Sequence, residues 1–103
     1  MYSVIFITTK DMSEAEKISK ALVSKKLVAC VNIVKGIKSF FWWEGKVDEA
    51  NEVLLILKTK RSYFEKIEKA VKLLHSYDVP EIIALPIIEG SKDYLRWVNA
   101  SLW

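Results

Sequence analysis

Few side chains in this sequence of 103 residues are suited to nucleophilic or metal chemistry. Cys30 is the only cysteine and His75 is the only histidine. A closed zinc site needs four ligands of this kind, so one chain does not supply it, although a site shared between subunits stays open. A nucleophilic pair of Cys30 and His75 would need a third, orienting group, which the sequence does not identify. The simpler interpretations are a small buried cysteine and a histidine near a helix end.

Polar side chains inside apolar strands are a second group of candidates. Lys58 follows a run of aliphatic residues, and a lone buried ammonium is costly unless it pairs or faces a polar pocket. Asn32 and Glu81 are polar in similarly apolar surroundings. These residues either line a ligand pocket between subunits or hold an assembly together by hydrogen bonds. The candidate pocket consists of Cys30, Asn32, Trp43, Lys58, Tyr77 and Glu81.

Other chemical signals are weak. The carboxylates Asp48, Glu49 and Glu52 form a cluster that we interpret as a solvated surface. The sequence contains no glycine-rich phosphate loop and no zinc-ligand spacing. We therefore predict no catalytic residue and no organic cofactor.

Composition narrows the class of protein. With 51% hydrophobic and 28% charged residues, the sequence predicts a single ordered domain spanning residues 1–103. Its 16 basic and 13 acidic residues are too balanced to suggest a nucleic-acid partner. No apolar run approaches the ~20 residues of a membrane span. A single cysteine, and the lack of a signal peptide before the first strand, lead us to expect a cytoplasmic protein.

Hydrophobic periodicity predicts the secondary structure. Strands are expected at residues 2–9, 27–34, 53–59 and 82–88, and helices at 13–26, from residue 62 and from residue 91. Capping boxes of serine and glutamate are expected to begin the first two helices, at Ser13 and Ser62. The first and third strands are apolar on both faces and should be central, whereas Pro86 places the last strand at an edge.

Residues 27–60 predict one long β-hairpin. Gly36 suggests a bulge in its first arm, and Glu44-Gly45 supplies the turn. Four consecutive aromatic residues, 40–43, lie at its tip and would expose up to ~800 Å², more than a soluble monomer usually shows. We interpret the tip as a surface for assembly.

The order of elements predicts an α+β fold. A ferredoxin-like βαββαβ sandwich with a long central hairpin and an extra C-terminal helix accounts for all of them. Right-handed crossovers place both long helices on one face of the sheet. The other face stays apolar and uncovered, which predicts an oligomer of closed cyclic symmetry.

Five motifs, in this order and spacing, closely resemble the CutA family of divalent-cation tolerance proteins. They are Ala29–Asn32, Trp42–Lys46, Leu57–Thr59, His75–Ile82 and Asp93–Trp97. The resemblance implies a cytoplasmic homotrimer of ferredoxin-like subunits, similar in architecture to PII signalling proteins. It also implies a role in tolerance of copper and other divalent metals, without a known reaction.

The resemblance also bears on metal binding. Copper ligation proposed for some members of the family uses a cysteine and a histidine at the positions of Ile7 and Leu74, which leaves His75 as the candidate metal ligand here. We expect a non-enzymatic trimer with weak or indirect copper binding. The alternative is a PII-like sensor that binds a small ligand in the inter-subunit cleft, and an enzyme that uses Cys30 ranks last.

Overall fold

One antiparallel sheet of four strands organises the chain, in the order β2-β3-β1-β4. The computed structural model describes all residues, 1–103. Its elements are β1 (Tyr2–Thr9), α1 (Met12–Ser24), β2 (Cys30–Trp43), β3 (Lys46–Lys60), the short 3-10 helix η1 (Arg61–Tyr63), α2 (Phe64–Leu74), β4 (Ile82–Pro86) and α3 (Lys92–Ser101). The predicted ferredoxin-like α+β fold is confirmed. None of the helices has the length and apolar character that crossing a membrane requires.

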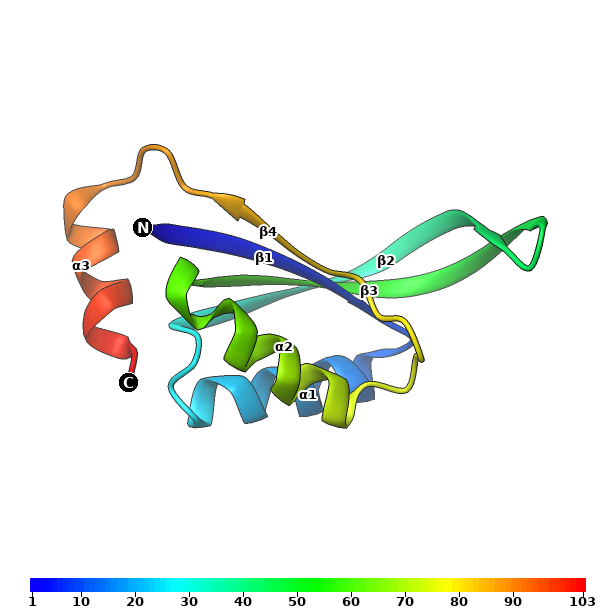
Figure 1. Cartoon of the computed structure of the whole chain (residues 1–103), viewed down its shortest axis with the longest axis horizontal. Coiled ribbons are helices and arrows are strands. Elements are labelled where there is room, and N and C mark those ends of the chain that lie inside the picture. The colour runs from blue at the N-terminus through cyan, green and yellow to red at the C-terminus, as the bar shows by residue number, and fades with distance from the viewer.

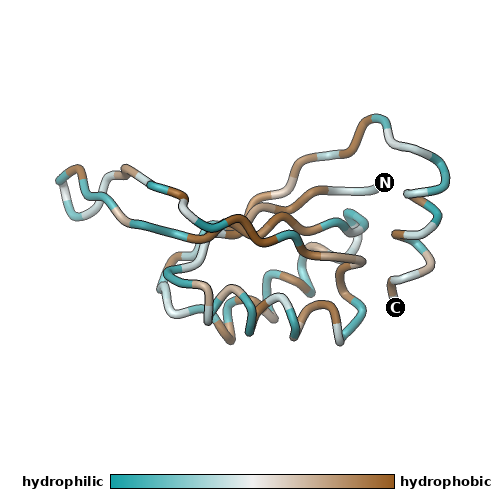
Figure 2. The backbone as a smooth tube through the Cα atoms, turned by 180° about the vertical axis from the view of Figure 1, so that it is seen from behind, coloured by the Kyte–Doolittle hydropathy of each residue, from teal (hydrophilic) through white to brown (hydrophobic).

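Helices α1 and α2 cover one face of the sheet, and α3 lies at one end of it, near the start of β1 (Figure 1). Side chains alternate along β1 and along β3 from Val53 to Thr59, so every second one is buried beneath the helices. Seen from behind, the strands are largely hydrophobic where they cross the body of the molecule (Figure 2). The core consists of Ile5, Ile7, Ala15, Ile18, Leu22, Val28, Val53, Leu55, Leu57, Ile67, Ala70 and Val71.

The opposite face of the sheet has no helix over it (Figure 1). Residues that pair across neighbouring strands share this face, because directly opposed side chains point the same way. We call it the open face; it carries Tyr2, Val4, Phe6, Thr8, Cys30, Asn32, Val34, Leu54, Ile56, Lys58, Lys60, Ile83 and Leu85. Ile83 and Leu85 are 50% and 45% exposed. The sequence-based expectation of an apolar, uncovered face is therefore met in the single chain.

Strand positions agree with the sequence. β1 and β3, both predicted to be central, lie in the middle of the sheet, and β2 and β4 form its edges. Pro86 is the last residue of the edge strand β4, where its missing N–H costs no ladder hydrogen bond. β4 is shorter than predicted, since it ends at Pro86 instead of continuing to Ile88.

The hairpin of β2 and β3 forms an arm that extends beyond the body (Figure 1). The pairing register shifts between Val34 and Ile37, and Gly36 between them has φ of +80°. This is the predicted bulge, which bends and twists the strand that carries it. At the tip Glu44 and Gly45 have φ of +48° and +77°, the two positive values typical of a tight hairpin turn. The molecule measures 45 Å along its longest axis and 25 Å along the next.

Both predicted capping boxes are wrong. Helix α1 is capped by Asp11, which lies in an extended conformation and accepts the Glu14 backbone N–H at 2.8 Å. Ser13 is already inside the helix, because Asp11 is an equally good cap two residues earlier. Before α2, Ser62 lies in η1, and the N-cap Tyr63 makes no side-chain capping bond. The one serine cap that the sequence predicts correctly is Ser91, which begins α3.

The segment between α1 and β2 also differs from prediction. Helix α1 ends at Ser24, and Lys26 adopts φ of +57°, so Lys25 and Lys26, which the predicted helix 13–26 includes, lie outside it. The Leu27 N–H donates to the Leu22 carbonyl in the last turn of α1. This bond holds Leu27 against the end of the helix, so the strand begins later. β2 therefore starts at Cys30 instead of residue 27. The Trp103 N–H donates to the Lys26 carbonyl at 2.9 Å, which ties the C-terminal residue to this turn.

The observed cap of α1 leads to a testable expectation. Asp11→Ala removes the acceptor of the Glu14 N–H and should lower the free energy of unfolding by roughly 0.5–2 kcal/mol. Ser13→Ala is the matched control, since it changes a neighbouring position that makes no capping bond, and should stay within about 0.5 kcal/mol of the wild type. Urea denaturation followed by circular dichroism measures both. A larger effect at Ser13 than at Asp11 would contradict the assignment.

Candidate functional site

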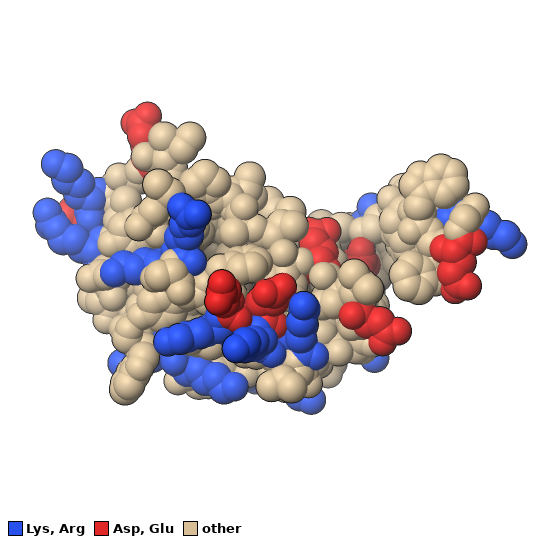
Figure 3. Space-filling model, viewed as in Figure 1, with Lys and Arg blue, Asp and Glu red and all other residues tan.

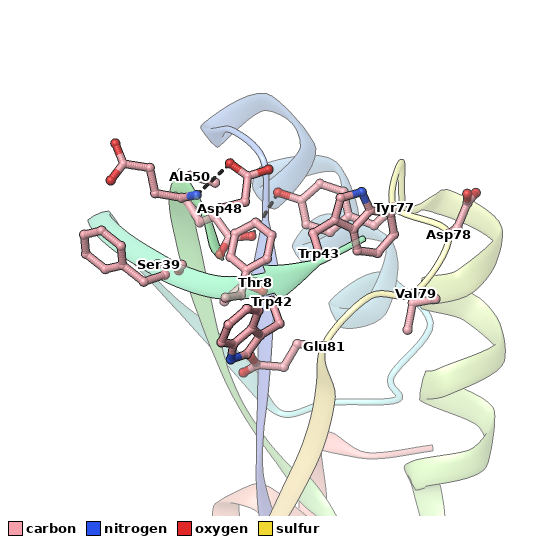
Figure 4. A pocket seen from close by; sticks show the side chains of 14 residues that line it. Thr8, Ser39, Trp42, Trp43, Asp48, Ala50, Tyr77, Asp78, Val79 and Glu81 are labelled. Carbon is pink, nitrogen blue, oxygen red and sulfur yellow. Dashed lines mark hydrogen bonds between the residues drawn. The ribbon is translucent and has the colours of Figure 1, made fainter. Parts of the chain in front are cut away.

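A cleft of about 810 Å³ opens where the arm leaves the body of the molecule. One wall belongs to the arm, and the other to the loop between α2 and β4 (Figure 4). Acidic side chains gather around this junction on the surface (Figure 3). We call it the arm cleft; it is lined by Thr8, Ser39, Phe40, Phe41, Trp42, Trp43, Asp48, Glu49, Ala50, Glu52, Tyr77, Asp78, Val79 and Glu81.

The arm side of the cleft follows from the hairpin register. Beyond the bulge, Phe41 pairs with Asp48 and Phe40 with Glu49. Aromatic residues of β2 therefore lie directly across from acidic residues of β3. Trp42 and Trp43 reach from the arm toward the loop that carries Tyr77 and Glu81 (Figure 4). Trp42 is 74% exposed and Trp43 52%. Large rings are therefore left in contact with water along this wall.

Tyr77 connects the loop to the sheet. Its hydroxyl donates to the Glu52 carboxylate at 2.9 Å, and its ring lies 4.8 Å, centroid to centroid, from that of His75. Burial raises the pKa of Tyr77 to about 12, with smaller contributions from the hydrogen bond to Glu52 and from the charge of Glu52. The Tyr77 hydroxyl therefore stays protonated, and keeps its hydrogen bond to Glu52, well above neutral pH.

Negative charge is concentrated in the arm cleft. Among the lining residues five are acidic, and none is Lys, Arg or His. Although Glu81 is exposed overall, partial desolvation raises the pKa of its carboxyl group, and the negative charge of Glu52 raises it further. Of the five carboxylates only Glu49 has a basic partner, Lys38 at 3.7 Å. The other four, Asp48, Glu52, Asp78 and Glu81, form no ion pair.

His75 follows the last residue of α2, in line with the helix-end interpretation. Its side chain is fully buried. Nδ1 accepts the backbone N–H of Tyr77 at 3.1 Å, which places the ring proton on Nε2, and Nε2 donates to the Thr8 carbonyl at 2.7 Å. Glu14, whose carboxylate accepts the Ser76 N–H at 2.9 Å, lies 3.7 Å from Nδ1. The histidine thus holds the loop against β1 and α1.

These hydrogen bonds bear on metal binding at His75. A metal needs a free lone pair on one ring nitrogen, and here both nitrogens have backbone partners. Within the chain, no three His, Cys, Asp and Glu side chains converge closely enough to hold a metal ion. In this conformation His75 does not fit the role of a metal ligand. Direct metal ligation by His75 remains a prediction that these hydrogen bonds do not support.

The six residues of the sequence-predicted pocket fall into two groups within one chain. Trp43, Tyr77 and Glu81 line the arm cleft. Cys30, Asn32 and Lys58 lie on the open face, where the Lys58 ammonium donates to the Asn32 side-chain oxygen. That the two groups meet between subunits stays a prediction. Cys30 also has a neighbour that the sequence did not suggest, because its sulfur lies 3.6 Å from the hydroxyl of Tyr94. Partial burial raises the pKa of Tyr94, and the contact with Cys30 raises it further.

Two acidic residues at this junction were missed by sequence reasoning. The sequence predicts Glu52 on a solvated surface. In the structure its carboxylate accepts the Tyr77 hydroxyl, and its charge raises the pKa of Glu81. Glu14 was not singled out, whereas it is buried and accepts the Ser76 N–H. The only available signal was the alternation of β3, which places Glu52 on the same face as Lys58. Nothing local indicated that the loop would fold back over that end of the strand.

Comparisons with known proteins extend over the whole chain. The family model described as CutA1 divalent ion tolerance protein matches residues 3–101. A relative from Archaeoglobus fulgidus, named divalent-cation tolerance protein CutA, is 47% identical over 102 residues and is covered to 99%, as is this chain. The solved structure of the divalent cation tolerance protein (Cut A1) from Thermus thermophilus matches with a TM-score of 0.98, at 47% identity and 100% coverage of both chains. The structure of the periplasmic divalent cation tolerance protein CutA from Archaeoglobus fulgidus matches with a TM-score of 0.96, at 48% identity and 98% coverage of both.

The raised pKa of Tyr77 predicts a loss of stability at alkaline pH. Tyrosine ionises near pH 10 in the unfolded chain and at about 12 in the folded one, so between these values the unfolded state binds fewer protons. The free energy of unfolding should therefore fall as the pH rises from 10 toward 12, and Tyr77→Phe should flatten this fall. Urea denaturation at about pH 8 and about pH 11.5 measures the difference.

Tyr2→Phe serves as the control for this experiment, because Tyr2 contacts Lys60 through its ring and not its hydroxyl. It should keep the wild-type dependence on pH. An identical dependence in the wild type and Tyr77→Phe would show that the hydroxyl of Tyr77 is not protected as described.

Proposed function

Because the chain belongs to the CutA1 family of divalent ion tolerance proteins, we propose that it acts in copper tolerance as a cytoplasmic, non-enzymatic homotrimer. The observation that supports the class of function is the family match over residues 3–101. The assembly is supported by the open face, and the cytoplasmic location by the single, partly buried Cys30, which needs no oxidising compartment. The related protein of known structure from Archaeoglobus fulgidus is described as periplasmic, so location is tested separately, by fractionation of the source cells.

The open face is the strongest physical support for an oligomer. Leaving apolar surface in water costs ~25 cal/mol per Å², and eight of the thirteen residues on this face are aliphatic or aromatic and come from all four strands. Among its polar members, Lys58 and Asn32 already bond to each other and can be buried as a pair. The exposed aromatic arm supplies a second apolar surface that can reach a neighbouring copy.

We propose that metal tolerance operates indirectly or through weak metal contacts. The only histidine is buried and bonded at both nitrogens, and no closed ligand set forms within a chain. A donor set shared between subunits would have to use carboxylates, or Cys30 on the open face. Thiolates and imidazoles are the ligands that copper prefers, so carboxylates alone favour weak binding.

A second candidate function is that of a PII-like sensor that binds a small molecule. The arm cleft favours it, since about 810 Å³ lies within the ~300–1,000 Å³ typical of small-molecule sites. Aromatic side chains are also common in the walls of such sites. Metal tolerance and small-molecule sensing can belong to one protein if binding of the small molecule in the cleft signals the state of the cell.

Assembly through the open face leads to a direct test. At micromolar concentration the wild type should sediment as a trimer, and Ile56→Asp, which places a carboxylate in the middle of the open face, should shift it toward the monomer. Leu73→Asp is the matched control, because Leu73 is 85% exposed on α2 and far from this face, and it should stay trimeric. A stable wild-type monomer would exclude the proposed assembly.

The role of His75 can be tested by native mass spectrometry in the presence of copper. If metal contacts are weak or indirect, the wild type and His75→Ala should retain the same small amount of copper. His75→Ala should instead lower stability, because it leaves the Thr8 carbonyl and the Tyr77 N–H without partners. Stoichiometric copper on the wild type that is lost in a folded His75→Ala variant would overturn this view and restore a direct ligand role.

A further inference from the structure

The open face carries opposite charges at its two ends. Lys58 and Lys60 lie at the end of β3, beside the start of β1. Glu52 lies on the same face of β3, six residues before Lys58, which is about 20 Å along a strand. Between them this face of β3 carries Leu54 and Ile56. An apolar strip thus separates a basic end of the open face from an acidic one.

Glu81 joins Glu52 at the acidic end, where the arm begins. It precedes Ile83 by two residues and continues the alternation that places Ile83 on the open face. Partial desolvation raises the pKa of Glu81, and the charge of Glu52 raises it further, as expected for carboxylates that lie close together. No basic side chain lines the cleft at this end, and neither carboxylate forms an ion pair. Negative charge there is uncompensated within the chain.

Lys58 has the opposite imbalance. Its ammonium group donates to the side-chain oxygen of Asn32 and forms no ion pair. Because Asn32 is neutral, this bond satisfies one of the three ammonium donors and leaves the positive charge without a counterion. When another copy of the chain covers the open face, this charge is removed from water, which is costly unless an opposite charge lies beside it. The covered face therefore needs a carboxylate next to Lys58.

The same chain does not supply that carboxylate. None of the thirteen paired residues of the open face is acidic. Glu52 is about 20 Å from Lys58 along β3. Glu81 lies about 13 Å from Lys58 along the strands and about 10 Å across them, because β1 separates β3 from β4. A neighbouring copy, with its own acidic end, is the available source.

We propose that Lys58 of each subunit forms an ion pair with Glu81 of the partner subunit, so that neighbouring copies pack head to tail over their open faces. The acidic end of one copy then covers the basic end of the next, and the apolar strips meet between them. Glu81 is a better partner than Glu52, whose carboxylate already accepts the Tyr77 hydroxyl. Heterologous contacts of this kind can close into a ring. This inference rests on the proposed homotrimer and names the polar contact that sets its register.

Charge reversal followed by sedimentation over a dilution series tests the pair. Lys58→Glu and Glu81→Lys each bring like charges together at every contact of the ring, and each should raise the concentration at which half of the trimer dissociates by roughly tenfold or more. The variant that carries both reversals has opposite charges again and should return to within about threefold of the wild type. Within one chain Glu81→Lys removes a repulsion from Glu52, so weaker assembly of this variant would not reflect a weakened subunit.

Two reversals on the helices are the matched controls. Glu16 and Lys69 are exposed on α1 and α2, which cover the other face of the sheet, so Glu16→Lys and Lys69→Glu should leave the trimer unchanged. Circular dichroism shows whether each variant is folded. If a reversal does not fold, Lys58→Met, Glu81→Gln and the two together replace it. The combined neutral variant should then weaken the trimer less than the two single effects added together.

The outcomes separate the ion pair from the trimer. A wild-type trimer that the single reversals weaken, and that the combined reversal does not restore, would overturn the pairing of Lys58 with Glu81 and leave the trimer in place. Single reversals that leave dissociation unchanged would also overturn the pairing. A wild type that is monomeric throughout the dilution series would remove both the pair and the assembly on which it rests.

Discussion

Apolar side chains on both faces of β1 and β3 are the constraint to which the rest of the structure responds. Helices α1 and α2 cover one face and form the hydrophobic core of the chain with it. They leave the second face with nothing from the same chain to cover it, so the fold of one subunit and the need for neighbours have the same origin. The arm extends the sheet beyond the helices, where its side chains have no core to join and are free to form walls of a cleft.

Patterns that depend on a few neighbouring residues were predictable. The bounds of β1, the bulge at Gly36 and the turn at Glu44 and Gly45 follow from local alternation and from backbone freedom at glycine. The central and edge positions of the strands followed from two-sided apolar runs and from Pro86. Helix starts were less predictable, because Asp11 and Ser13 are both good caps and only the path of the preceding strand decides between them.

The candidate site depended on geometry that no local pattern encodes. The sequence predicts a pocket between subunits that joins Trp43, Tyr77 and Glu81 with Cys30, Asn32 and Lys58, and within one chain only the first three line the arm cleft. The separation arises from the bend of the arm and from the loop after α2. That loop is held by His75 and Glu14, whose contacts join segments more than 60 residues apart in sequence. Long-range hydrogen bonds of this kind cannot be read from composition or periodicity.

The register shift at Gly36 has a consequence for how such an arm can change its length over evolutionary time. Because the pairing restarts at Ile37 and Glu52, the strands beyond it are independent of the register that buries the core. Adding or deleting matched pairs of residues, two on each strand, would lengthen or shorten the arm while every core side chain kept its face. The span of the cleft and the reach toward a neighbour can thus be adjusted by small insertions, with no change to the folded body.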